Sequence, residues 1–144
     1  MRKITAFTLV ACTFAMAQVS PPTPGSARAR AAGATPGTAY TDGKSLQNLV
    51  RLQPHGKAIS LQLGDQEMTV FTGQRRAFSN GDPVVLPGAP FVLEGRSYYP
   101  TGLLRAMGCS VEAAGRTPGL KDVLSVTCHV DGKLKKLLFK KLIF

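Results

Sequence analysis

The sequence predicts a single small domain of the α+β class, with short antiparallel strands and one short helix. Stretches in which every second residue is apolar recur between residues 58 and 130 and are typical of half-buried strands. Pairs of turn-forming residues separate these stretches, as in β-hairpins. The 144 residues can form one hydrophobic core but are too few for two cores with linkers.

A β-hairpin is predicted over residues 58–71. Ala58–Leu63 alternates apolar and polar residues, and Gly64-Asp65 is a turn signal before a second apolar stretch. Residues 75–82 are rich in polar and turn-forming residues, which predicts a loop. Pro83–Pro87 is then a short extended segment, whose prolines suit a position at a sheet edge.

The next segment combines two short strands and a helix. Phe91–Leu93 leads through the turn Glu94–Arg96 into Ser97–Tyr99. Successive strand residues point to opposite faces, so one ring of the Tyr98-Tyr99 pair is expected in the core and the other in solvent. Pro100–Met107 has apolar residues at helical spacing, begins with a proline and is followed by Gly108, which together predict a helix of about two turns.

The order of these pieces resembles the copper amine oxidase N-terminal-like domain, a small stalk module of exported bacterial proteins. The motif is Gly95-Arg96-Ser97-Tyr98-Tyr99-Pro100, followed by Leu103, Leu104 and Gly108, and the resemblance extends from Ala58 to Val130. It implies a small curved antiparallel sheet packed around one short helix. It also implies structural roles for six residues: Gly95, Arg96, Tyr98, Tyr99, Pro100 and Gly108. The sequence departs from the family pattern at Thr101-Gly102, which favours a helix less strongly.

Cys109 and Cys128 are predicted to form a disulfide. Each lies in a stretch with strand-like alternation, and pairing Val111 with Val126 places Cys109 opposite Cys128. Opposed residues at such positions have Cα atoms about 4.5 Å apart, a separation that a disulfide tolerates. Cys12 lies in the predicted signal peptide described below, so its removal leaves these two of the three cysteines in an exported protein, which also favours a disulfide.

The first 17 residues are typical of a secretory signal peptide. Met1-Arg2-Lys3 is basic, Ile4–Ala17 carries no charge, and Ala15-Met16-Ala17 is a small-x-small end, which predicts cleavage before Gln18 and export. The uncharged run is shorter than the roughly 20 residues of a membrane-spanning helix. Leu9-Val10-Ala11-Cys12 offers an alternative, because it resembles the lipobox of bacterial lipoproteins and would anchor the protein through a lipidated Cys12.

Residues 18–45 are predicted to be a flexible linker, so that the domain comprises residues 46–144. The segment is rich in Pro, Gly and Ala and has no strand or helix periodicity.

The C-terminal segment is strongly cationic. Asp131-Gly132 is a hairpin turn signal, and the residues after it fit a helix somewhat better by periodicity, whereas the family resemblance favours a last strand. Both alternatives stay open. The lysines expected to contact an anionic surface are Lys133, Lys135, Lys136, Lys140 and Lys141.

Charge and motifs together favour a binding function. The net charge of +10 becomes +8 when the signal takes Arg2 and Lys3 with it, so anionic lipid or cell-wall polymer is the expected partner. Nucleic acid is not favoured, because no groove-reading motif occurs. His55 and His129 lack a metal-ligand pattern, and no nucleophile motif is present, so neither a cofactor nor a catalytic residue is predicted. The sequence predicts a non-enzymatic envelope domain for binding or spacing, or alternatively a membrane-associated protein acting through its tail or Cys12.

Overall fold

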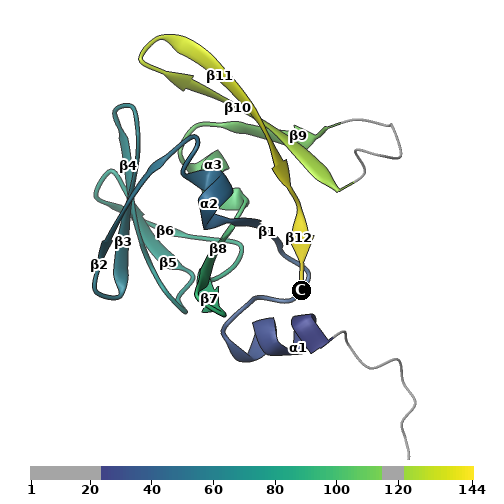
Figure 1. The fold of residues 1–144 in the computed structure, drawn as a ribbon. Helices are drawn as coiled ribbons and strands as arrows, with labels where there is room; N and C mark the ends of the chain where they lie inside the picture. The colour runs from purple at the N-terminus through teal and green to yellow at the C-terminus, as the bar shows by residue number, and fades with distance from the viewer. Residues whose placement is uncertain (1–23, 115–121) are drawn as a thin grey trace, which may run out of the picture.

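The computed structural model describes residues 24–114 and 122–144. This part of the chain contains three short helices and twelve strands, so the fold is α+β with far more strand than helix (Figure 1). The helices are α1 (Pro24–Ala31), α2 (Gly43–Leu46) and α3 (Gly102–Ala106). The strands are β1 (Ala39–Asp42), β2 (Arg51–His55), β3 (Ala58–Leu63), β4 (Gln66–Phe71), β5 (Arg76–Ser79), β6 (Asp82–Val85), β7 (Phe91–Leu93), β8 (Arg96–Pro100), β9 (Ser110–Ala113), β10 (Val123–Val130), β11 (Lys133–Lys140) and β12 (Leu142–Ile143).

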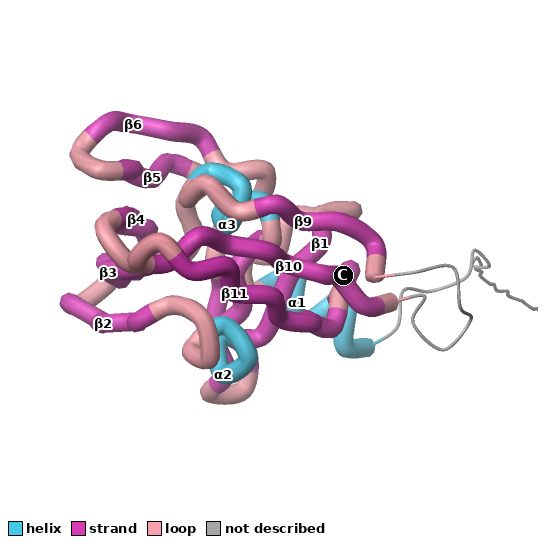
Figure 2. Tube along the Cα trace, turned by 90° about the horizontal axis from the view of Figure 1, so that it is seen from above, coloured by secondary structure: helices cyan, strands magenta, loops and turns pink. Residues whose placement is uncertain are grey.

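The strands form three antiparallel sheets rather than the single curved sheet that the resemblance implied. Their strand orders are β2-β3-β4-β5-β6, β11-β10-β9 and β12-β1-β8-β7. The five-stranded sheet lies on one side of the short helices α2 and α3, and the β10–β11 hairpin lies on the other (Figures 1 and 2). One apolar core, with residues from all three sheets, joins them.

The predicted hairpin over residues 58–71 is confirmed, since β3 pairs with β4 along its whole length. The loop predicted at 75–82 is wrong, because Arg76–Ser79 forms β5 and pairs with β6. The two strands are joined by Asn80-Gly81, with φ angles of 51° and 89°. Positive φ at both residues is the conformation that the tightest hairpin turns require. The proline-flanked strand β6 lies at the sheet edge, as predicted.

The C-terminal segment is a strand and not a helix. β11 pairs with all of β10 through the turn at Asp131-Gly132. As a strand, the segment turns Phe139 inward, where only 2% of the residue is exposed. On the other side of β10, β9 pairs with Val111 opposite Val126, the register that the cysteine argument assumed.

The disulfide between Cys109 and Cys128 is confirmed. Their Cα atoms are 4.4 Å apart, and both residues are buried in the core. The bond links Cys109, which immediately precedes β9, to Cys128 of β10.

The interpretation of residues 18–45 as a flexible linker is wrong for residues 24–45; residues 18–23 and the predicted signal lie outside the described part of the chain. β1 is a central strand, paired with both β8 and β12. Tyr40 of β1 is fully buried; its hydroxyl donates to the Ala89 carbonyl at 2.8 Å and accepts the Thr35 N–H at 2.9 Å. Residues 24–45 show no strand or helix periodicity in the sequence. They are held in the fold by the buried Tyr40 side chain and by pairing with strands that lie far away in sequence.

The predicted helix is confirmed in place but is shorter, because Pro100 belongs to β8 and pairs with Tyr40. Leu103 and Leu104 of α3 are fully buried in the core. A Cβ at Gly102 would lie 2.4 Å from Cγ of Pro87. Packing against Pro87 therefore explains why a residue that favours helix poorly stands at this position.

Candidate functional site

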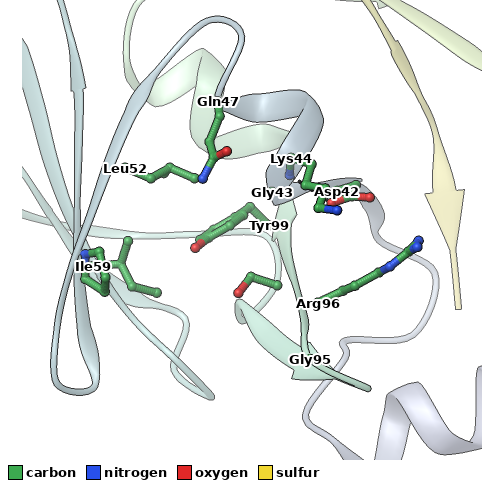
Figure 3. Close-up of a pocket in the computed structure, with 11 residues that line it drawn as sticks. Asp42, Gly43, Lys44, Gln47, Leu52, Ile59, Gly95, Arg96 and Tyr99 are labelled. Atoms are coloured by element: carbon green, nitrogen blue, oxygen red, sulfur yellow. Dashed lines mark hydrogen bonds between the residues drawn. The ribbon is translucent and has the colours of Figure 1, made fainter.

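The family motif borders a hollow on the surface (Figure 3). The hollow lies between α2, the β2–β3 hairpin and the turn that joins β7 to β8, and has a volume of about 260 Å³. Its lining combines charged, hydroxyl, amide and apolar side chains. These residues are Asp42, Gly43, Lys44, Gln47, Leu52, Pro54, Ile59, Gly95, Arg96, Ser97 and Tyr99.

The upper wall of the hollow is held in place by the start of α2. The Asp42 side chain accepts the Lys44 N–H at 2.8 Å and so caps the helix. A Cβ at Gly43 would lie 3.2 Å from both the Ser97 carbonyl oxygen and a ring carbon of Tyr99. Glycine therefore lets α2 approach β8 closely enough to form the wall.

The motif strand β8 divides its side chains between two faces. Ser97 and Tyr99 share one face and line the hollow, whereas Arg96 and Tyr98 share the other. In Figure 3, the Tyr99 hydroxyl points into the space near Leu52, and Arg96 points away from it. The expectation of one core ring is confirmed for Tyr99, of which 3% is exposed.

Tyr98 departs from the expectation of a solvent-exposed ring. It is half-buried and stacks on Phe91, with ring centroids 5.0 Å apart and planes at 15°. The Phe144 ring meets Tyr98 edge-on at 5.5 Å. Tyr98 therefore belongs to a second, aromatic core cluster beneath β7 and β8.

Besides the charged side chains of Asp42, Lys44 and Arg96, the hollow is lined by neutral hydrogen-bonding groups. Burial raises the pKa of Tyr99 above 10.0, and hydrogen bonding with Ser97 acts in the opposite direction. The phenol therefore keeps its proton at neutral pH and can donate a hydrogen bond. Together with the Ser97 hydroxyl and the Gln47 amide, it offers both donors and acceptors to a ligand.

A second hollow, of about 230 Å³, lies on the other face of β8. It shares Asp42 and Arg96 with the first, so these two residues stand between the two spaces. Lys140 of the cationic tail and Arg96 both line this second hollow. The residues are Asp42, Ser45, Arg96, Tyr98, Lys140 and Leu142.

The five tail lysines do not form one patch. Lys136 and Lys140 share the outer face of β11 with two leucines, Leu134 and Leu138, which are 62% and 59% exposed. We call these four residues the Leu–Lys face. Lys133 and Lys135 lie on the opposite face of the strand, since they pair in register with Val130 and Cys128. Both lysines are exposed. Lys141 is half-buried between β11 and β12.

Residues 24–114 and 122–144 show neither a metal-ligating cluster nor a membrane-spanning helix. These residues contain no group of three or more His, Cys, Asp or Glu side chains placed to hold a metal ion. Within the same ranges, no helix has the length and apolar character needed to cross a bilayer. His129, adjacent to Cys128, is exposed on the outer face of β10.

The sequence interpretation missed the seven residues that line the first hollow from outside the motif: Asp42, Gly43, Lys44, Gln47, Leu52, Pro54 and Ile59. Asp42 carried a usable signal, because Asp immediately before a short helix is a preferred N-cap. Leu52 carried none, since Arg51–His55 is an edge strand whose exposure pattern does not alternate regularly.

The described residues form a small, β-rich domain linked by one disulfide. The chain belongs to the copper amine oxidase N-terminal domain family, whose model matches residues 43–120, more than half of its length. The match includes the motif and both α2 and α3, whereas β1 and β10–β12 lie outside it. Comparisons with curated proteins and with solved structures find no match.

Proposed function

We propose that this chain is an exported, non-catalytic domain that binds anionic components of the cell envelope through the Leu–Lys face. The family match is to the N-terminal domain of copper amine oxidases and not to their catalytic domain. Export is supported by the signal-like pattern of residues 1–17.

The observation that carries the proposal is the composition of this face. Lys136 and Lys140 alternate with exposed Leu134 and Leu138 on an edge strand. On the same face of the sheet, the residues of β10 and β9 that lie beside these four include one carboxylate, Glu112. The face is therefore cationic, and it is rigid because β11 is paired with β10 along its length.

Export can be tested by the mass of the mature protein isolated from its host. We expect a chain that begins at Gln18, since cleavage follows Ala15-Met16-Ala17. A mass that fits an acylated chain beginning at Cys12 would replace this prediction with the lipoprotein alternative. An uncleaved chain starting at Met1 would contradict export by either route.

Lys136→Gln combined with Lys140→Gln tests the binding surface. Each lysine near an anionic bilayer contributes about 1 kcal/mol, so we expect the double variant to bind phosphatidylglycerol-containing vesicles roughly 20- to 30-fold more weakly at low salt. The loss should shrink as added salt screens the lysines. Cosedimentation with the vesicles measures both effects.

The matched control is Lys133→Gln with Lys135→Gln, which removes the same charge from the same strand but from its other face. We expect this control to lose clearly less affinity. An equal loss in the two double variants would mean that net charge, and not the Leu–Lys face, governs binding.

A bilayer is favoured over a soluble wall polymer by the two exposed leucines. A leucine that enters the bilayer interior contributes about 1.5–3 kcal/mol, which a polymer in water would not supply. Leu134→Ser with Leu138→Ser should therefore abolish vesicle binding and leave binding of soluble polyphosphate unchanged. If vesicle binding survives the double variant, the polymer is the better assignment.

A further inference from the structure

The two hollows beside the family motif form a site that the Leu–Lys face does not explain. They flank β8, one on each face, and share Arg96 and Asp42. We propose that together they bind an acidic saccharide, with one sugar ring in the first hollow and the acidic group of the next ring near Arg96. This inference shares Lys140 with the Leu–Lys face and otherwise rests on residues outside that face.

The chemistry of the first hollow fits a sugar ring. The apolar side chains of Leu52, Pro54 and Ile59 form one wall, and a pyranose ring has an apolar C–H face to place against it. Ser97, Tyr99 and Gln47 present hydroxyl and amide groups to the same space, which matches the donors and acceptors of sugar hydroxyls. Ligand pockets usually combine an apolar lining with a few polar groups in this way.

The size of the hollow limits what can enter. Its volume of about 260 Å³ lies just below the usual range of about 300–1,000 Å³ for pockets that hold drug-sized molecules. One ring therefore fills it, and the rest of a longer chain must lie outside. The second hollow shares Arg96 and Asp42 with the first, and the proposal places the next part of the saccharide there.

Charge selects an acidic ligand. Around the two hollows stand three cationic side chains, Lys44, Arg96 and Lys140, against the single carboxylate of Asp42. Asp42 is already engaged as the cap of α2, accepting the Lys44 N–H at 2.8 Å. Arg96 is exposed, carries a planar fork of donors suited to a carboxylate, and points toward the C-terminal strands in Figure 3.

The test uses tetragalacturonate as the acidic probe and galactotetraose as a neutral probe of similar size. Calorimetric titration of the full chain should show saturable binding of tetragalacturonate and clearly weaker binding of galactotetraose. Backbone amide shifts should concentrate at Gly95–Tyr99 and at Asp42–Gln47. Equal binding of the two probes, or no saturable binding of either, would overturn the proposal.

Variants then assign the contacts. Arg96→Gln should weaken tetragalacturonate binding roughly tenfold or more, as expected for the loss of a charged hydrogen bond. Arg76→Gln is the matched control, because Arg76 is also an exposed strand arginine but lines neither hollow. An equal loss in both variants would show nonspecific attraction to a cationic protein and would overturn the site.

Two further variants distinguish the sugar site from the Leu–Lys face. Ser97→Ala should weaken binding of both sugar probes, because the Ser97 hydroxyl is expected to bind the sugar ring and not its acidic group. Lys136→Gln should leave sugar binding unchanged, since this residue lies on the Leu–Lys face and outside the two hollows. Binding of tetraglutamate as tight as that of tetragalacturonate would overturn the assignment to a saccharide.

Discussion

Replacing both Cys109 and Cys128 by alanine is expected to lower the free energy of unfolding by about 3 kcal/mol. The bond closes a loop with a sequence separation of 19, and the chain-entropy model gives about this value for a loop of such length. Alanine is the suitable replacement because both positions are buried, and serine would leave a hydroxyl in the core. Urea unfolding of the oxidised protein and the double variant measures the difference.

The same measurement under reducing conditions provides the control. A reductant should destabilise the wild-type protein by a similar amount and leave the alanine double variant unaffected. A wild-type protein that unfolds at the same urea concentration with and without reductant would contradict the stabilising role of the bond.

Tyr40→Ala is expected to destabilise the domain by about 3–5 kcal/mol, the usual cost of truncating a buried aromatic side chain. The ring is fully buried, with centroids 5.0 Å from Phe91 and 5.9 Å from Phe144. Tyr40→Phe keeps the ring but removes the hydrogen bonds to Ala89 and Thr35. We expect this second variant to lose about 1–3 kcal/mol, because the buried Ala89 carbonyl and the partly buried Thr35 N–H lose their partner.

Thermal or urea unfolding of both variants tests whether residues 24–45 are part of the fold. Arg30→Ala is the control from the same segment, since Arg30 is exposed and its truncation should change stability by less than about 0.5 kcal/mol. If Tyr40→Ala were as stable as the wild type, the segment would be a linker after all.

Sequence patterns correctly predicted elements that are formed by residues close together in the sequence. The alternation of Ala58–Leu63 and the turn at Gly64-Asp65 specify a hairpin whose strands are neighbours in sequence. The disulfide followed from the same logic, because the register of Val111 with Val126 determines which residues oppose one another. These predictions rest on strand periodicity, turn residues and, for the disulfide, the expected export of the protein.

The sequence did not predict the features that depend on distant partners. β1 has only four residues and pairs with β8 and β12, so its short pattern resembles the surrounding Ala- and Gly-rich sequence. The tail is ambiguous by sequence because Lys135 and Lys141 interrupt the helical pattern, and neither face of a strand would be purely apolar. Pairing with β10 and burial of Phe139 favour the strand, and neither can be inferred from residues 133–144 alone.

The candidate site was predicted in part. The motif residues Gly95, Arg96 and Tyr99 were identified as structural, and the structure places all three around the first hollow. The opposite walls come from α2 and β2, which the sequence interpretation placed in or next to the linker. A hollow forms between elements, so its lining cannot be known until their packing is known.

The pairing of β1 with β12 has a consequence for how fast the chain folds. Ala39 and Ile143 are paired although they lie about one hundred residues apart. Contacts between residues so far apart in sequence slow folding. Closing the long loop between them costs conformational entropy, and this cost comes before the contacts in the sheet stabilise the chain. We therefore expect the β3–β4 and β10–β11 hairpins to form early and the β12-β1-β8-β7 sheet to close last, once the C-terminal residues of β12 are available.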